Sequence, residues 1–246
     1  MNFLEPFHSE AQANLARLAA NPYPGRGIVL GRASAGFLVQ LYWIMGRSAN
    51  SRNRVFVEED GRLRTAPADP AAMEDPSLVI YTAMDAHRGR HVVTNGDHTD
   101  RILEGLRGGR DFRDGLWGQD YEPDPPNHTP RIAGVTEAGP GGAGAWLAVV
   151  KANPLDQSTL RFFYDFEELS AGFGWGVHTY LGDGAPLPSF AGEPILLPLE
   201  GDEPALAQTY WAALNPEHRV ALALKRIAED GKSAQITVIN RFQRGG

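Results

Sequence analysis

The chain has 246 residues, of which 42% are hydrophobic and 22% charged, an ordinary composition for a folded protein with a full core. That length allows one large domain or two small ones. The net charge of −7 argues against nucleic acid as a partner, although a local arginine cluster can still bind a small anion. The chain contains no cysteine, which excludes disulfides, thiolate nucleophiles and cysteine-ligated zinc.

Neither a membrane span nor a signal peptide is predicted. No apolar run approaches the length of a membrane span. The first six residues lack the charged and apolar regions of a signal peptide. We therefore expect a cytoplasmic protein without a membrane partner.

The first part of the chain is predicted to form a helix followed by a hairpin. Ser9 can cap the helix, which ends at Asn21-Pro22. Residues 26–31 and 37–45 indicate two strands joined by the turn 33–36. The Gly-x-Gly pattern in this region opens no helix, so it does not indicate a dinucleotide site.

Residues 46–54 form a loop without large apolar side chains that carries Arg47, Arg52 and Arg54. Arginine forks match the oxygens of phosphate and carboxylate groups. A solvated basic turn is the alternative interpretation of the same residues.

Strands dominate the rest of the chain. Beyond the first hairpin they are predicted at residues 55–58 and 63–65 around Asp60-Gly61, at 77–84, 89–94, 129–137, 145–151, 160–166 and 175–181, and in a C-terminal hairpin around Asp230-Gly231. A helix begins near Pro204, whereas residues 182–194 hold too much glycine and proline for regular structure. The pattern predicts an α+β protein of two mainly antiparallel sheets packed together with helices outside.

A dense polar segment, Asn95 to Asp100, follows one of these strands and opens a helix with Asp97 as its cap. The positive end of that helix lies beside Asn95 and Gly96, which favours an anion there. The loop-rich stretch 107–128 is long for a compact domain and is therefore more often functional than accidental.

Nucleophilic and metal-dependent chemistries lack their usual patterns. The chain has no Gly-x-Ser-x-Gly elbow, and Asn2 after Met1 offers no N-terminal nucleophile without further processing. Asp97, His98 and Asp100 lie close together, but no His-Glu-x-x-His spacing supports zinc, so no metal is expected.

A metal-free polar site remains, in which arginines hold an anion, Tyr81 and Glu122 transfer protons, and Asn95 orients an amide or carbonyl. Each residue also has a structural interpretation. Tyr81 fits a core aromatic residue, Asn95-Gly96 fits a turn, and Glu122 fits a solvated carboxylate.

Several polar motifs occur in one order along residues 23–135. They are Arg26-Gly27, Gly46-Arg47-Ser48 with residues 50–54, Tyr81, residues 94–100, residues 121–124 and residues 129–132. Together they resemble the archaeal-type IMP cyclohydrolase family, and the similarity continues more loosely through residues 178–180 to the C-terminal hairpin.

The resemblance implies a four-layered α-β-β-α fold like that of the N-terminal nucleophile hydrolases, without the self-processing nucleophile. We expect a single catalytic domain of this kind at residues 23–246, preceded by a helical extension at residues 1–22. The implied activity is closure of 5-formamidoimidazole-4-carboxamide ribotide to IMP in purine biosynthesis. We expect a nucleotide substrate, no cofactor and a homo-oligomer.

The resemblance also implies the residues of the site. The catalytic set is Arg52, Tyr81, Asn95 and Glu122. The substrate-binding set is Arg47, Ser48, Arg54, Gly96, Asp97, Arg131 and His178. Within these sets, Glu122 and Tyr81 share the acid and base roles, Asn95 polarises a carbonyl, and one or more of the loop arginines hold the 5′-phosphate.

The chain departs from the archaeal pattern in its helix before residue 22, in the segment 182–194 and in its tail. These departures leave open a hydrolase or binding protein for another ribonucleotide on the same scaffold. A purely structural protein is a third class, but it leaves the polar loops unexplained.

Overall fold

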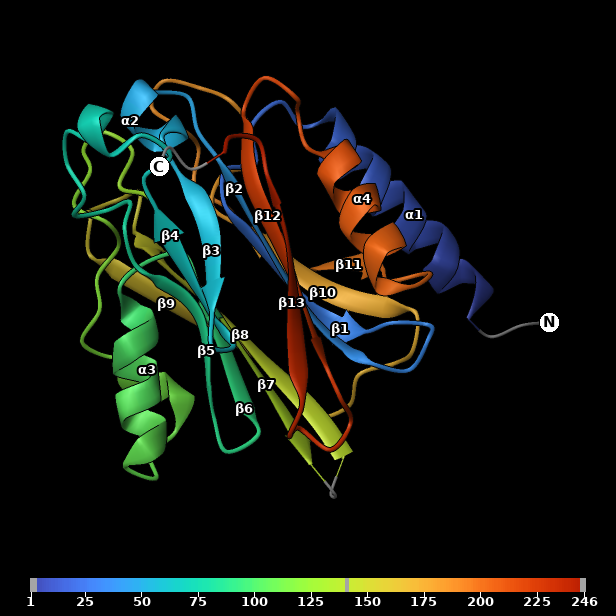
Figure 1. Ribbon diagram of the computed structural model, residues 1–246. Coiled ribbons are helices and arrows are strands. Elements are labelled where there is room, and N and C mark those ends of the chain that lie inside the picture. Colours follow the sequence, from blue (N-terminus) through green and yellow to red (C-terminus); the bar gives the residue numbers. More distant parts are fainter. Residues whose placement is uncertain (1–3, 140–141, 244–246) are drawn as a thin grey trace.

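The computed structural model of the protein describes residues 4–139 and 142–243, which form two antiparallel sheets with helices on their outer faces (Figure 1). The six-stranded sheet runs in the spatial order β11 (Ile195–Pro198), β10 (Phe173–His178), β1 (Gly27–Arg32), β2 (Leu38–Met45), β12 (Arg219–Ile227), β13 (Ala234–Asn240). The seven-stranded sheet follows chain order: β3 (Val55–Glu59), β4 (Arg62–Ala66), β5 (Thr82–His87), β6 (Arg90–Thr94), β7 (Arg131–Gly139), β8 (Gly142–Ala152), β9 (Thr159–Phe166).

Helices cover the outer face of each sheet. Helices α1 (Glu5–Ala20) and α4 (Glu203–Ala213) lie side by side on the six-stranded sheet, and α3 (His98–Arg107) lies on the seven-stranded sheet (Figure 1). The short elements are α2 (Ala49–Arg52) and the 3-10 turns η1 (Pro70–Ala72) and η2 (Phe112–Gly115). The layers therefore follow the order α-β-β-α, and the predicted pair of antiparallel sheets flanked by helices is confirmed.

Strand β2 shows why the sequence forms this sandwich. All eight of its residues are buried because it has a covered face on both sides. Tyr42 and Ile44 face the core between the sheets, while Leu41 and Trp43 face the helices. Alternation of side chains along a strand produces this division.

Several boundaries differ from the sequence prediction. Helix α1 begins at Glu5, before the predicted cap Ser9, whose hydroxyl instead donates to the Glu5 carbonyl within the helix (3.2 Å). The segment 77–84 was predicted as one strand, but strand β5 begins only at Thr82. The amides of Val79 and Ile80 both donate to the Pro76 carbonyl in a turn (3.1 and 3.0 Å), and this turn prevents an earlier start.

Other predictions agree with the structure at two hairpins and differ from it at one loop. The Asp60-Gly61 and Asp230-Gly231 hairpins are confirmed. Helix α2 lies within the predicted loop 46–54, and strand β11 lies where no element was predicted. The connection between the strands predicted at 129–137 and 145–151 includes residues 140–141, which lie outside the described residues. Within residues 4–139 and 142–243, no helix is long and apolar enough to cross a membrane.

Candidate active site

A cavity of about 360 Å³ opens at the end of the sandwich that carries α2. Its wall comes from five parts of the chain that are distant in sequence. It is lined by Tyr23, Gly25, Arg26, Met45, Arg47, Ser48, Asn50, Ser51, Arg54, Asp75, Leu78, Val79, Glu122, Asp124, Asn127, Thr129, Tyr180 and Leu187. Polar side chains predominate, so the cavity suits a polar ligand.

A buried ion pair forms part of this wall. Arg26 donates from Nη1 and Nη2 to the two carboxylate oxygens of Glu122, at 2.8 and 2.7 Å. The Arg26 and Glu122 residues are only 8% and 3% exposed. A fork-to-fork pair of this kind fixes the orientation of both groups. The ion pair therefore fixes the Glu122 carboxylate in the wall of the cavity.

Burial shifts the proton affinities of this pair. Burial raises the pKa of Glu122, and the hydrogen bonds from Arg26 oppose that rise. Burial alone would lower the pKa of Arg26, but the Glu122 carboxylate outweighs it and raises that pKa well above its usual value. Arg26 therefore stays charged, and the Glu122 carboxyl is easier to protonate than an exposed one.

Asn95 supports the Arg26–Glu122 pair through its backbone carbonyl, and its side-chain amide forms hydrogen bonds with backbone groups. Its amide nitrogen donates to the Pro130 carbonyl (2.9 Å), and its amide oxygen accepts from the Ile132 amide (2.8 Å). The Asn95 carbonyl in turn accepts from Arg26 Nη1 (2.9 Å). Asn95 is fully buried, so its side chain joins the chain after β6 to the start of β7.

The basic loop contributes two of its three arginines to the cavity wall. Arg47 is held by Asp183 and the Gly184 carbonyl, and its guanidinium lies 5.1 Å from the centre of the Tyr23 ring. Arg54 is 3% exposed and donates to the Ser51 carbonyl (2.8 Å). Both therefore offer positive charge at the cavity.

Arg52 points elsewhere, to the Gly46 carbonyl (2.9 Å) and to His218 Nδ1 (3.1 Å). Ser48 caps the short helix α2 by accepting from the Ser51 amide (3.1 Å), and its residue lines the cavity. The loop thus places Arg47, Ser48 and Arg54 in the cavity wall, whereas Arg52 does not line the cavity.

Comparison with known proteins places the chain in a family. A sequence model of the family described as "IMP cyclohydrolase-like protein" matches residues 23–231, most of the chain. The chain belongs to this family. The match begins just after α1, which packs on α4 and β11 of the same body.

Relatives named IMP cyclohydrolase come from several archaea. The protein of Methanocella arvoryzae is 33% identical over 141 residues, 56% of this chain and 67% of the relative. That of Methanopyrus kandleri is 33% identical over 52% of this chain and 63% of the relative. That of Methanococcus maripaludis is 33% identical over 46% and 57% respectively. These alignments thus cover between 57% and 67% of the length of the relatives.

Tyr81, which the family resemblance placed among the catalytic residues, lies at the inner face of the sandwich rather than on the cavity wall. Its hydroxyl is 2.6 Å from the hydroxyl of Tyr42, and both residues are buried. Both tyrosine hydroxyls lie close enough to Arg26 to interact with it electrostatically. Burial, followed by the neighbouring Tyr81 hydroxyl, raises the pKa of Tyr42 well above its usual value.

The start of helix α3 differs from the expected cap. Asp97 occupies the capping position, but its side chain makes no capping hydrogen bond and instead accepts from Arg131 Nη1 (2.6 Å). Arg131 also donates to the Asp120 carbonyl (2.9 Å), and a Cβ at Gly96 would lie 2.8 Å from its guanidinium. Gly96, Asp97 and Arg131 therefore form a cluster of their own beside the Asn95 backbone, outside the cavity wall.

His178 is buried against Phe190, with the ring centres 4.7 Å apart, and its Nδ1 donates to the Tyr180 carbonyl (2.7 Å). Burial lowers the pKa of His178 to about 4, so the ring is neutral near pH 7. His178 does not line the cavity, although Tyr180, two residues later, does.

Sequence reasoning missed several residues of the wall. Thr129 bonds through its hydroxyl to Asp124 of its own loop and to Tyr180, which joins two distant segments on one side of the cavity. Arg26 was noticed as part of a motif but received no role. Its Arg-Gly position just before a strand was the available signal, because strand ends often carry functional side chains.

Proposed function

We propose that the protein is an IMP cyclohydrolase, which closes the ring of 5-formamidoimidazole-4-carboxamide ribotide and releases water. The supporting observation is the buried Arg26–Glu122 pair in the wall of a cavity that also presents Arg47 and Arg54. Membership in the IMP cyclohydrolase-like family adds to it. An anionic nucleotide and a group that transfers protons would then meet in one cavity.

The reaction suits a site without a nucleophile. The carboxamide nitrogen of the substrate attacks the formyl carbon of the same molecule, so an enzyme that holds the two groups in contact supplies much of the rate. The nitrogen then loses a proton and the departing hydroxyl gains one. Glu122 is the wall residue best suited to that transfer, because it is a carboxylic acid whose pKa is raised by burial.

The phosphate of the substrate would bind at the basic loop. Arg47 and Arg54 supply charge, and the Ser48 and Ser51 residues on the same wall supply hydroxyl groups. Arg52 would act from behind this loop, through its bond to the Gly46 carbonyl (2.9 Å). Gly96, Asp97, Arg131 and His178 would support the wall from outside.

Tyr81 and Asn95 receive positioning roles in this proposal. Tyr81 would act through its hydroxyl, which lies 2.6 Å from the Tyr42 hydroxyl, and it would assist the proton transfer of Glu122. Asn95 would hold Arg26 through its backbone carbonyl, because both ends of its side-chain amide already bind backbone groups. A direct role in polarising a substrate carbonyl has less support.

We further propose that the layer order corresponds to the N-terminal-nucleophile-hydrolase-like fold, with residues 23–246 as one catalytic domain and residues 1–22 as a helical extension. A cytoplasmic location and a homo-oligomeric state belong to the same proposal. The α-β-β-α order of layers supports the fold assignment.

The test is a direct assay of ring closure. The purified protein is incubated with the formamido ribotide and a chelator, and IMP is followed by its ultraviolet absorbance. We expect turnover without added metal, because the proposed chemistry uses only side chains. An unchanged spectrum, with and without chelator, would refute the assignment.

Another purine-type ribonucleotide is the alternative substrate. The observation in its favour is the segment 182–194, which brings Leu187 to the cavity wall and Asp183 to Arg47. Melting temperatures measured with IMP and with a panel of other purine ribonucleotides separate the two, because a specific ligand stabilises the folded state by mass action. A larger shift with a nucleotide other than IMP would favour the alternative.

A further inference from the structure

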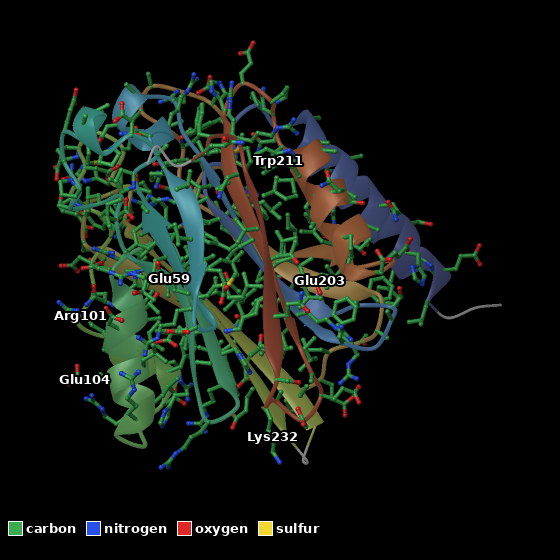
Figure 2. The ribbon with its side chains drawn as sticks, in the orientation of Figure 1. Glu59, Arg101, Glu104, Glu203, Trp211 and Lys232 are labelled. Atoms are coloured by element: carbon green, nitrogen blue, oxygen red, sulfur yellow. The ribbon has the colours of Figure 1, made fainter. Side chains whose placement is uncertain are left out.

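A second cavity, of about 690 Å³, opens at the end of the sandwich where the hairpin turns of both sheets meet. Its mouth carries charges of both signs, from Asp60, Arg88, Asp230 and Lys232. Figure 2 shows Lys232 at the tip of the β12–β13 hairpin, away from the end that carries α2. This cavity therefore shares no wall with the candidate active site.

Lys225 of β12 lines this cavity and carries an uncompensated charge. It pairs across the strands with Gln40 of β2, and cross-strand partners face the same side of a sheet. Gln40 donates to the His91 carbonyl of the other sheet (2.7 Å), so both side chains face the space between the sheets. Lys225 is 1% exposed, and among the described residues its ammonium has no hydrogen-bond acceptor and no carboxylate within 4.0 Å.

The nearest acidic residue of the cavity does not neutralise Lys225. Asp85 forms an ion pair with Arg62 at 3.2 Å, so its charge is already compensated. Burial lowers the pKa of Lys225 to about 8, and Asp85 opposes that fall only in part. A buried ammonium without a partner is costly, and an anion that enters the cavity would relieve that cost.

Two buried acceptors beside Lys225 also lack partners. They are Gln40 Oε1 and His91 Nδ1. The other ring nitrogen of His91, Nε2, lies 3.3 Å from the Gly231 carbonyl and so carries the proton. Burial, with Lys225 as a further cause, lowers the pKa of His91 to about 4, so near pH 7 its Nδ1 is a free acceptor. A ligand that matches these groups needs a hydroxyl donor as well as a negative charge.

We propose that this cavity binds a small phosphate oxyanion that carries a hydroxyl group or an acidic proton. Its charged oxygens accept from the Lys225 ammonium, and its hydroxyl donates to Nδ1 of His91, which lines the cavity with Lys225. The mouth residues balance one another in charge, so the net attraction comes from Lys225. The site does not depend on the function proposed for the other cavity.

The test follows the His91 ring by nitrogen NMR while inorganic phosphate is added near pH 7.5. The signal is assigned by its loss in His91→Phe. We expect a saturable shift of the Nδ1 resonance in the unmodified protein, and sulfate, which has no hydroxyl at this pH, shifts it less. A phosphate monoester with an alcohol hydroxyl, such as glycerol 3-phosphate, that shifts the signal at lower concentration than inorganic phosphate points to an ester as the natural ligand, and the reverse order points to free phosphate.

A matched pair of variants assigns the charge. Lys225→Met keeps the unbranched stem of the side chain, which is one atom shorter, and removes the ammonium, and we expect it to weaken phosphate binding about 10- to 100-fold at this site. Lys232→Met at the mouth is the control and changes it less than about threefold, because an exposed charge is screened. An unmoved His91 signal at saturating phosphate, or equal binding in Lys225→Met and the unmodified protein, overturns the proposal. The phosphate-dependent shift itself is measured on the unmodified protein, and His91→Phe serves only to assign the signal.

Discussion

Arg26 and Glu122 connect the two sheets of the sandwich through a two-pronged ion pair. Arg26 directly precedes β1 of one sheet, and Glu122 lies in the loop between α3 and β7 of the other. The two residues are 96 positions apart in the chain. The pair is therefore both a part of the cavity wall and a tie between layers.

Replacing Glu122 tests both roles. Glu122→Gln should lower turnover of the formamido ribotide by about 10²-fold or more, the scale of a positioned acid or base. It should also lower the free energy of unfolding by about 3–5 kcal/mol, because Arg26 is left buried without a counter-charge. Steady-state kinetics and urea denaturation measure the two effects.

The control is Glu137→Gln, which breaks the surface pair with Arg90 (3.1 Å). We expect a change below about 1 kcal/mol there, as for exposed ion pairs. Near-normal turnover in Glu122→Gln would remove this carboxylate from the proposed mechanism.

The Tyr81–Tyr42 pair distinguishes a participating hydroxyl from its neighbour. Tyr81→Phe should lower turnover about 10²-fold while circular dichroism shows an intact fold. Tyr42→Phe removes the other end of the same 2.6 Å hydrogen bond and should cost less than tenfold. If the two variants lose the same activity, the effect belongs to the hydrogen bond and not to Tyr81.

Asn95→Ala should reduce stability strongly. The change leaves the Ile132 amide and the Pro130 carbonyl without their buried partners, each of which costs about 1–3 kcal/mol. Chemical denaturation should therefore show a total loss of roughly 2–6 kcal/mol. Asn50→Ala, on the cavity wall, serves as control, since the Asn50 amide donates only to the Asp75 carbonyl near the surface (3.2 Å). A loss of stability no larger than that of the control would contradict the structural role of Asn95.

The three arginines of the basic loop should differ in their effect on substrate affinity. Arg47→Met and Arg54→Met should each raise KM for the ribotide about tenfold or more, because charged hydrogen bonds to phosphate are strong. Arg52→Met is the matched control, since its guanidinium bonds to Gly46 and His218 behind the wall. A KM that rises most in Arg52→Met would place the phosphate on the other side of the loop.

Stability should fall on acidification below pH 6.5. Burial lowers the folded-state pKa of His98 to about 3 and that of His178 to about 4, from an ordinary value of 6.5. The unfolded chain therefore binds more protons between those values, so stability present above pH 6.5 is lost as the pH falls towards 4 and 3. A pKa that differs by one between the folded and the unfolded chain corresponds to about 1.4 kcal/mol, which gives an upper limit of roughly 3 kcal/mol for His178.

Denaturation curves at pH 7.5, 6, 5 and 4 measure this slope. In His178→Gln the loss between pH 6.5 and 4 should be smaller than in the unmodified protein, because one titrating ring is absent. Equal slopes in the two proteins would show that other groups govern the acid sensitivity.

Local sequence patterns predicted most of the sheet architecture. The Asp-Gly pairs at 60–61 and 230–231 mark hairpins whose register depends on adjacent residues only. The strand predicted at 77–84 was displaced because the turn on the Pro76 carbonyl competes with it, and apolar periodicity does not register such a turn. Helix α2 was missed because four residues are too few to show a helical repeat.

The site was predictable only in part. Glu122 was found from its polar motif, and Arg47, Ser48 and Arg54 from the composition of one loop. The partner of Glu122 was not found, because it depends on how two sheets stack and not on any local spacing. The family resemblance pointed to Asn95, whereas only the structure shows that its side chain binds backbone.

The tie between the sheets has a consequence for how the protein would lose activity on storage or heating. Each sheet is held by its own ladder of strands, so a small parting of the layers can leave both ladders intact while it separates Arg26 from Glu122. Inactivation would then run ahead of any loss of secondary structure. The half-life of the activity would then depend on the stability of the contact between the two sheets rather than on the stability of either sheet.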